Sequence, residues 1–233
     1  MRMRDILEDA LITYRQEVAS LLTLVAPAVL VGPFLVVLAA SGLIMAVVIV
    51  PLLVLLYLAT YAACVRAAGF VLRNLAPDPA LSYLDVLSAT PDLLRVAAPG
   101  GILLATVTAC ALVISDMAGP LLALQVGLLG FAAFLVWWAR HAYDQPLILI
   151  HEVEAEEAAQ VSAQLARGGL VWTLLLLAMV SLPLVAVALL SLGLAAAITP
   201  TFGGAVFTLA FALWLPVPAL SVTSACTRLV GAS

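Results

Sequence analysis

Residues 18–41, VASLLTLVAPAVLVGPFLVVLAAS, and residues 43–65, LIMAVVIVPLLVLLYLATYAACV, contain no charged side chain and are separated only by Gly42. A transmembrane helix needs about 20 predominantly apolar residues, and each run is longer than that. Both runs are apolar on every helical face, whereas the strands of a transmembrane barrel alternate polar and apolar residues. The two runs therefore predict a helical hairpin that crosses a bilayer and turns back at Ser41-Gly42.

The composition of the whole chain is that of a protein whose solvent is lipid. Of its 233 residues, 66% are hydrophobic and 9% are charged, and the mean hydropathy is +1.25. A soluble domain has about 45–50% apolar and about 25% charged residues, so this chain has too few charges to cover a water-exposed surface. We predict an all-α integral membrane protein whose main partner is the lipid bilayer. We expect no nucleic-acid binding, because the sequence has no basic patch.

Four further apolar runs predict spans at 99–117, 120–140, 169–191 and 201–226, which makes six in all. Short breaks alternate with long polar connections at 66–98 and 141–168, so we expect three hairpins. The nine basic residues are all arginines, and an even number of spans places them on one face: Arg2, Arg4, Arg15, Arg66, Arg73, Arg95, Arg140, Arg167 and Arg228. Positive charge favours the cytoplasmic side. We therefore expect both termini in the cytoplasm and the protein in a bacterial inner (plasma) membrane.

Each predicted hairpin follows a polar segment in which an acidic residue precedes an arginine by ten positions. These segments run from Asp5 to Arg15, from Asp85 to Arg95 and from Glu157 to Arg167. We predict interfacial amphipathic helices along the cytoplasmic headgroups, with these six residues as an interaction surface. In the middle segment, Thr90-Pro91-Asp92 predicts a helix restart with proline in its first turn.

The three segments also suggest an internal repeat. We predict a single polytopic domain over 1–233, built of repeats at 1–74, 75–150 and 151–233. The alternative is that any interfacial helix before a span has acidic residues early and an arginine at the membrane edge, in which case no repeat is needed.

Few residues offer membrane-embedded chemistry. Ionisable side chains inside spans usually mark transport or catalysis, and none is predicted near the centre of a span. His141 and His151, with Asp144 and Glu152 nearby, leave a metal site conceivable, but their spacing is not that of a helical ligand pair. We therefore expect no catalytic residue, no cofactor and no metal.

Cysteines and prolines inside the spans have structural interpretations. Cys64, Cys110 and Cys226 are expected to be buried, reduced thiols that pack as small apolar groups. Prolines inside spans are expected to kink the helices and to free backbone carbonyls that neighbouring groups must satisfy. The prolines concerned are Pro27, Pro33, Pro51, Pro183, Pro216 and Pro218.

Two stretches carry a resemblance to a known family. The first runs from Ala142 to Glu152, AYDQPLILIHE, and continues through Glu157-Ala158, Ser162, Leu165 and Arg167-Gly168. The second is the N-terminal run with Ala10, Tyr14-Arg15 and Leu21-Leu22. Together they resemble bacterial six-helix membrane proteins related to the membrane domain fused to some glycerophosphodiester phosphodiesterases. The soluble catalytic barrel of those enzymes has no counterpart here, so the resemblance implies a non-catalytic membrane module.

These observations favour a non-enzymatic membrane scaffold or accessory subunit that acts through its cytoplasmic interfacial helices. Its partner would be another membrane subunit, a cytoplasmic protein or a second copy of the chain. The alternative is a membrane component of a transporter, either one half of an ABC-type exporter or a carrier of a neutral or lipid-like substrate.

Overall fold

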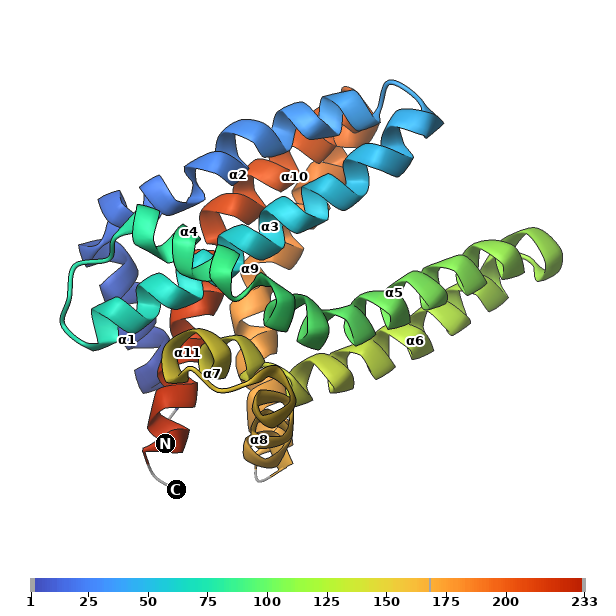
Figure 1. Cartoon of the computed structure of the whole chain (residues 1–233). Helices are drawn as coiled ribbons and strands as arrows, with labels where there is room; N and C mark the ends of the chain where they lie inside the picture. Colours follow the sequence, from blue (N-terminus) through green and yellow to red (C-terminus); the bar gives the residue numbers. More distant parts are fainter. Residues whose placement is uncertain (1–2, 168, 232–233) are drawn as a thin grey trace. The chain divides into compact units, whose positions relative to one another are not determined.

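The computed structural model describes residues 3–167 and 169–231, but not the side chains of several residues within 43–50, 104–131 and 192–200. All regular structure in these residues is helical, which confirms the all-α prediction (Figure 1). The helices are α1 (Met3–Gln16), α2 (Val18–Ala39), α3 (Leu43–Leu72), α4 (Pro79–Ser88), α5 (Thr90–Ala118), α6 (Pro120–Arg140), α7 (Asp144–His151), α8 (Ala155–Arg167), α9 (Leu170–Ala197), α10 (Pro200–Trp214) and α11 (Pro216–Val230).

Among the residues that the structure describes, four helical stretches are long and apolar enough to cross a membrane: Val18–Ala39, Pro51–Leu72, Leu170–Ala195 and Thr201–Val230. They coincide with four of the predicted spans. The other two predicted spans, 99–117 and 120–140, lie within α5 and α6, where many side chains fall outside the described residues. The count of six therefore stays a prediction.

The chain divides into two compact units. Unit 1 comprises residues 1–88 and 177–233, and unit 2 comprises residues 89–176. In unit 1, α2 packs against both α3 and α10, and α11 packs against α3 and α1 (Figure 1). In unit 2, α5 and α6 form a long hairpin, and α8 contacts both of them as well as α7. The predicted repeats do not follow this division and stay a prediction.

Prolines begin several helices. Pro79, Pro91, Pro120, Pro200 and Pro216 each stand in the first turn of their helix, where the missing proline N–H leaves no hydrogen bond unmade. The predicted restart in the middle polar segment is confirmed, because α4 ends at Ser88 and α5 begins at Thr90.

The helix that contains the second predicted span, 43–65, is longer than that span, because α3 continues to Leu72. Residues 67–72, AAGFVL, are all apolar or small, and the charge of Arg66 is compensated within the fold. The helix ends in a Schellman motif: Leu75 N–H donates to Phe70 O at 2.9 Å, and Asn74 N–H donates to Val71 O at 2.9 Å. Asn74, with φ of 57°, occupies the left-handed position that this motif requires.

The predicted final span, 201–226, consists of two helices. α10 ends at Trp214 and α11 begins at Pro216, because a proline inside a helix can neither donate a hydrogen bond nor leave room for the preceding turn. The connection at 141–168 also differs from the predicted polar loop, since it contains α7, where the apolar residues from Pro146 to Ile150 are buried.

The prediction that all three cysteines are buried holds for Cys64 and Cys226 but is wrong for Cys110, which is exposed on α5. A free thiol behaves as a small hydrophobic group, so lipid tolerates it on the outside of a membrane helix.

The last part of α9 and the start of α10 approach each other closely. A Cβ atom at Gly203 of α10 would lie 2.4 Å from the backbone oxygen of Ser191 and 2.7 Å from the Cβ of Ala195, both in α9. At Gly193, also in α9, a Cβ would meet nothing within 4 Å. The contact therefore depends on glycine at position 203 and not at position 193.

This contrast predicts opposite effects of the same substitution. Gly193→Ala should raise the melting temperature in detergent, because alanine is favoured over glycine inside a helix by roughly 0.5–1 kcal/mol. Gly203→Ala should lower it, because a backbone oxygen cannot rotate out of the way. Thermal unfolding followed by circular dichroism measures both, and an increase for both variants would contradict the close contact.

Candidate functional site

The six predicted surface residues lie on four helices. Asp5 and Arg15 are on α1, Glu157 and Arg167 are on α8, and all four are exposed. In the middle segment, Asp85 is on α4 and Arg95 is on α5, because the helix restarts between them. Arg95 is exposed, whereas Asp85 is half-buried.

None of these acid–arginine pairs forms an ion pair in the part of the chain that the structure describes. In α1 and α8, ten positions correspond to about 15 Å along the helix axis, which is too far for contact. The exposed ends are thus free to meet lipid headgroups or a partner.

Asp85 is instead paired with Arg66 of α3. Arg66 Nε lies 2.6 Å from Asp85 Oδ2, and the two side chains are 17% and 30% exposed. The Arg66 guanidinium also lies over the ring of Phe70, 5.0 Å from its centroid, where the negative face of the ring attracts a cation. This pair fixes α4 to α3 with both charges largely removed from solvent.

A second contact holds α4 from the same side. The Tyr83 hydroxyl donates to Leu24 O of α2 at 2.7 Å and lies 3.3 Å from Thr60 Oγ1 of α3. Burial raises the pKa of the Tyr83 hydroxyl, the Thr60 hydrogen bond lowers it, and Cys64 adds a smaller increase. Tyr83 therefore remains protonated, and a donor, throughout the physiological pH range.

The Tyr83 bond belongs to a pattern. Each of three backbone carbonyls in unit 1, standing three residues before a proline, accepts a hydrogen bond from an aromatic side chain. The bonds run from Tyr83 to Leu24 before Pro27 (2.7 Å), from Trp214 to Val180 before Pro183 (2.8 Å) and from Tyr14 to Leu213 before Pro216 (3.2 Å). Proline opens the preceding helical turn, and in lipid the freed carbonyls need partners from neighbouring helices. The carbonyl that loses its helical donor stands four residues before each proline, so these bonds satisfy the next carbonyl of the same turn, and the expectation about the freed carbonyls stays a prediction.

The contacts of α4 give it an inverted amphipathic character. Ser82 and Val86 are buried, and Tyr83 and Asp85 face the bundle. Leu81, Leu84 and Leu87, at every third position, are 44%, 61% and 68% exposed. A helix on a water-soluble protein would turn its leucines inward. The leucine row of α4 (Leu81, Leu84 and Leu87) suits a lipid or partner surface.

In unit 2, Ser162 joins α8 to the end of α6. Its hydroxyl donates to Arg140 O at 2.8 Å and accepts from Tyr143 N–H at 3.2 Å. The Tyr143 hydroxyl lies 3.0 Å from Thr173 Oγ1, and both side chains are buried. Ser162 therefore fixes α8 beneath the hairpin, while Glu157 and Arg167 remain on its exposed face.

His141 pairs with a neighbour of its own. Its Nδ1 lies 2.9 Å from Asp144 Oδ2, and its ring stacks on Trp137 at 4.8 Å between centroids. The side chains of His151 and Glu152 are exposed. Among the described residues, no three histidine, cysteine or acidic side chains are grouped so that they could hold a metal ion.

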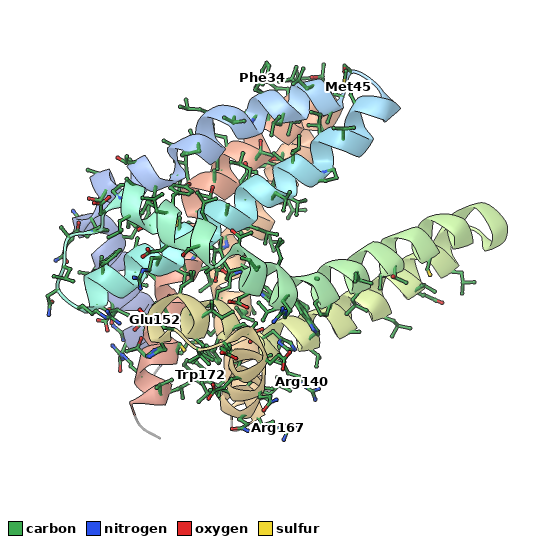
Figure 2. All side chains as sticks on the ribbon, in the orientation of Figure 1. Phe34, Met45, Arg140, Glu152, Arg167 and Trp172 are labelled. Atoms are coloured by element: carbon green, nitrogen blue, oxygen red, sulfur yellow. The ribbon has the colours of Figure 1, made fainter. Side chains whose placement is uncertain are left out.

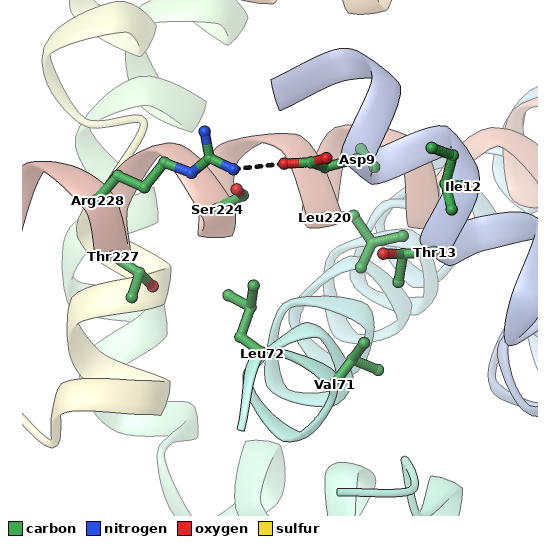
Figure 3. A pocket seen from close by; sticks show the side chains of 10 residues that line it. Asp9, Ile12, Thr13, Val71, Leu72, Leu220, Ser224, Thr227 and Arg228 are labelled. Carbon is green, nitrogen blue, oxygen red and sulfur yellow. Dashed lines mark hydrogen bonds and ion pairs between the residues drawn. The ribbon is translucent and has the colours of Figure 1, made fainter. Parts of the chain in front are cut away.

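A cavity of about 270 Å³ lies in unit 1 between α1, the end of α3 and α11 (Figure 3). Asp9 and Arg228 form an ion pair at its side (Figure 3). Its lining is part apolar and part hydroxyl: Ala10, Ile12, Thr13, Val71, Leu72, Leu220, Ser224 and Thr227 complete it.

Sequence reasoning missed both the Arg66–Asp85 pair and the cavity. A signal existed for the pair, because Arg66 is followed by six uncharged residues that continue the helix, and Asp85 stands among leucines. The cavity lies between three segments that are far apart in the sequence, and no local sequence pattern predicts it.

No family model, no curated protein and no solved structure matches this chain.

The Arg66–Asp85 pair predicts a strong dependence of stability on either charge. Asp85→Asn and Arg66→Gln should each destabilise the protein by about 1.5–3 kcal/mol, the range for hydrogen bonds to charged groups, because each leaves a charge largely buried without its partner. The control is the Arg4–Glu8 pair on α1, whose side chains are 83% and 56% exposed. Glu8→Gln should cost no more than about 0.5 kcal/mol. Equal effects in a denaturant titration in detergent would contradict the buried pair.

The Tyr83 hydroxyl and Pro27 should be energetically coupled. Tyr83→Phe should cost about 1 kcal/mol, because Leu24 O loses its donor. In a Pro27→Ala background the proline ring no longer holds the turn open, so Leu24 O can take its own helical donor, the Ala28 N–H, and the same change should cost clearly less. A double-mutant cycle from melting temperatures measures the coupling. Additive effects would show that the hydroxyl does not compensate for the proline.

Proposed function

We propose that this chain is an integral membrane scaffold or accessory subunit, not an enzyme, and that it contacts its partner through α1, α4 and α8. The observation that carries the proposal is α4. Its polar residues Tyr83 and Asp85 hold it on the bundle, and its leucine row faces outward.

A rigid, outward apolar row is what a lateral contact between proteins requires. Two anchors hold α4, so little conformational entropy remains to be lost when a partner packs on it. At the membrane edge, where water reaches the helix, a partner that covers the row also removes apolar surface from water. The exposed charges of α1 and α8, among them Asp5, Arg15, Glu157 and Arg167, would add contacts to headgroups or to a cytoplasmic protein.

The proposal includes six spans with both termini in the cytoplasm of a bacterial cell. α5 and α6 support it by length, with 29 and 21 residues against the roughly 20 that a span needs. In unit 1, α1 and the arginine-bearing ends of α3 and α11 meet around the cavity. In unit 2, Figure 2 shows Arg140, Arg167 and Trp172 at one end of the unit. Charges gathered at one end of each unit suit the positive-inside rule.

We also retain the threefold repeat as part of the proposal. A short helix precedes a pair of long ones in three places: α1 before α2 and α3, α4 before α5 and α6, and α8 before α9 and α10. The third copy departs from this order in one respect, because α10 ends before Pro216 and a further helix, α11, follows it.

Photo-crosslinking in native membranes tests the scaffold role. A photoreactive residue replacing Leu84 should give a discrete protein adduct, whereas one replacing Leu30 of α2, which is 74% exposed, should crosslink to lipid alone. The adduct should weaken in an Asp85→Asn background and disappear when Tyr83→Phe is added, because both anchors of α4 are then removed. The same adducts from both positions, or none from Leu84, would contradict the proposal. Lipid movement across vesicles that contain only this protein would favour the carrier alternative.

Cysteine labelling tests the topology. In a cysteine-free variant, a membrane-impermeant maleimide added to intact cells should label Ser41→Cys and Asp116→Cys, which stand at the outer turns of the first two proposed hairpins. It should label Gln164→Cys of α8 only after the cells are opened. Labelling of Asp116→Cys only in opened cells would show that α5 and α6 do not cross the membrane.

A further inference from the structure

The cavity between α1, α3 and α11 has two kinds of lining, as a site for an amphipathic molecule would. Its polar lining is the Asp9–Arg228 pair with the hydroxyls of Ser224 and Thr227 (Figure 3). Apolar side chains complete the lining, among them Leu72 of α3 and Leu220, which lies one turn before Ser224 on α11. Its volume of about 270 Å³ is near the lower end of the range for small-molecule sites, which suits a headgroup and not a whole lipid.

The two charges can recognise a ligand that carries both signs. Asp9 and Arg228 are 54% and 42% exposed, so their mutual attraction is screened and contributes only about 0.2–1 kcal/mol. A ligand can therefore separate or bridge them at small cost. A primary ammonium would bind the Asp9 carboxylate, and a phosphate would bind the Arg228 guanidinium, whose planar donors match phosphate oxygens.

The hydroxyls can complete the phosphate contact. Thr227 Oγ1 donates to Thr223 O at 3.0 Å and keeps its lone pairs for a ligand donor. Ser224 is only 6% exposed, and it lines the cavity. Ser224 lies one helical turn before Arg228 on α11, so the two side chains lie on the same face of the helix.

The position of the cavity favours a lipid as the source of this headgroup. α11 ends the membrane-spanning candidate Thr201–Val230, and Arg228 stands in its last turn. Leu72 is 43% and Ile12 is 53% exposed beside the opening, where they would contact the glycerol and the first acyl carbons of a lipid.

We propose that this cavity binds the headgroup of a phospholipid with a primary amine, that is, phosphatidylethanolamine. The ammonium pairs with Asp9, and the phosphate pairs with Arg228 and accepts from Ser224. The inference requires that unit 1 lies in a membrane, and it is independent of the scaffold role.

Native mass spectrometry of the delipidated protein in detergent tests it. Phosphatidylethanolamine should be retained with one-to-one stoichiometry, and phosphatidylcholine and phosphatidylglycerol should bind at least about tenfold more weakly, because the first has no ammonium hydrogen to donate and the second has no cation. Soluble phosphoethanolamine should compete poorly. Equal retention of the three lipids would overturn the proposal, and so would competition by phosphoethanolamine as strong as that of the lipid.

Variants locate the site. Asp9→Asn and Arg228→Gln should each reduce phosphatidylethanolamine retention about tenfold, while Glu8→Gln, on the same helix outside the cavity, should leave it unchanged. Ser224→Ala removes only a hydroxyl and should reduce retention severalfold even if the charge variants fail to fold. The assignment of the cavity as the lipid site would be overturned if Ser224→Ala, and each charge variant that folds, retained phosphatidylethanolamine as well as the unmodified protein does.

Discussion

Water is absent from the interior of a bilayer, and this absence constrains the polar groups of any helix that crosses it. A carbonyl or charge in lipid must find its partner within the protein, since no solvent molecule can supply one. Three aromatic side chains meet this requirement at helix turns opened by proline, and the Arg66–Asp85 pair meets it for the charges next to the membrane. The packing of unit 1 follows from these few directional contacts as much as from its apolar surface.

The same requirement explains why α4 lies as it does. Hydrophobic attraction between helices is weak in lipid, so turning leucines inward contributes little stability. Burying a carboxylate or a tyrosine hydroxyl against its hydrogen-bond partner contributes much more, because leaving either group unpaired is costly. Asp85 and Tyr83 therefore face α2 and α3, and the leucine row of α4 faces outward. An arrangement that would be unstable in water gives a membrane protein a fixed apolar surface. The scaffold proposal depends on that surface.

Much of the fold could be predicted from the sequence because long apolar runs leave few alternatives. The turn at Ser41-Gly42, the restart at Thr90 and the break before Pro200 all follow from local signals that the structure confirms. The end of α3 could not be predicted in this way. An arginine can mark the edge of a span without ending the helix, and α3 continues past Arg66 to Leu72. The buried helix α7 was hidden for a similar reason, since its short apolar run stands among the polar residues of a connection.

The candidate site was less accessible to sequence reasoning. The ten-residue spacing of acid and arginine identified helices that do exist, but it did not reveal that Asp85 alone among the six residues is turned inward. The cavity depends on α1, α3 and α11 meeting, and the Asp9–Arg228 contact joins opposite ends of the chain. Contacts between residues far apart in the sequence depend on tertiary structure, and the spacing of residues along the chain does not predict them.

Hydrogen–deuterium exchange of the protein in lipid nanodiscs tests the central claim most directly, namely that internal polar contacts hold α4 on the bundle. The account predicts that amides of residues 82–88 exchange as slowly as those of α2 and α3, and that Arg66→Gln accelerates exchange in α4 while leaving α2 protected. Rapid exchange throughout α4 in the unmodified protein would contradict it, since α4 would then be a loosely attached surface helix.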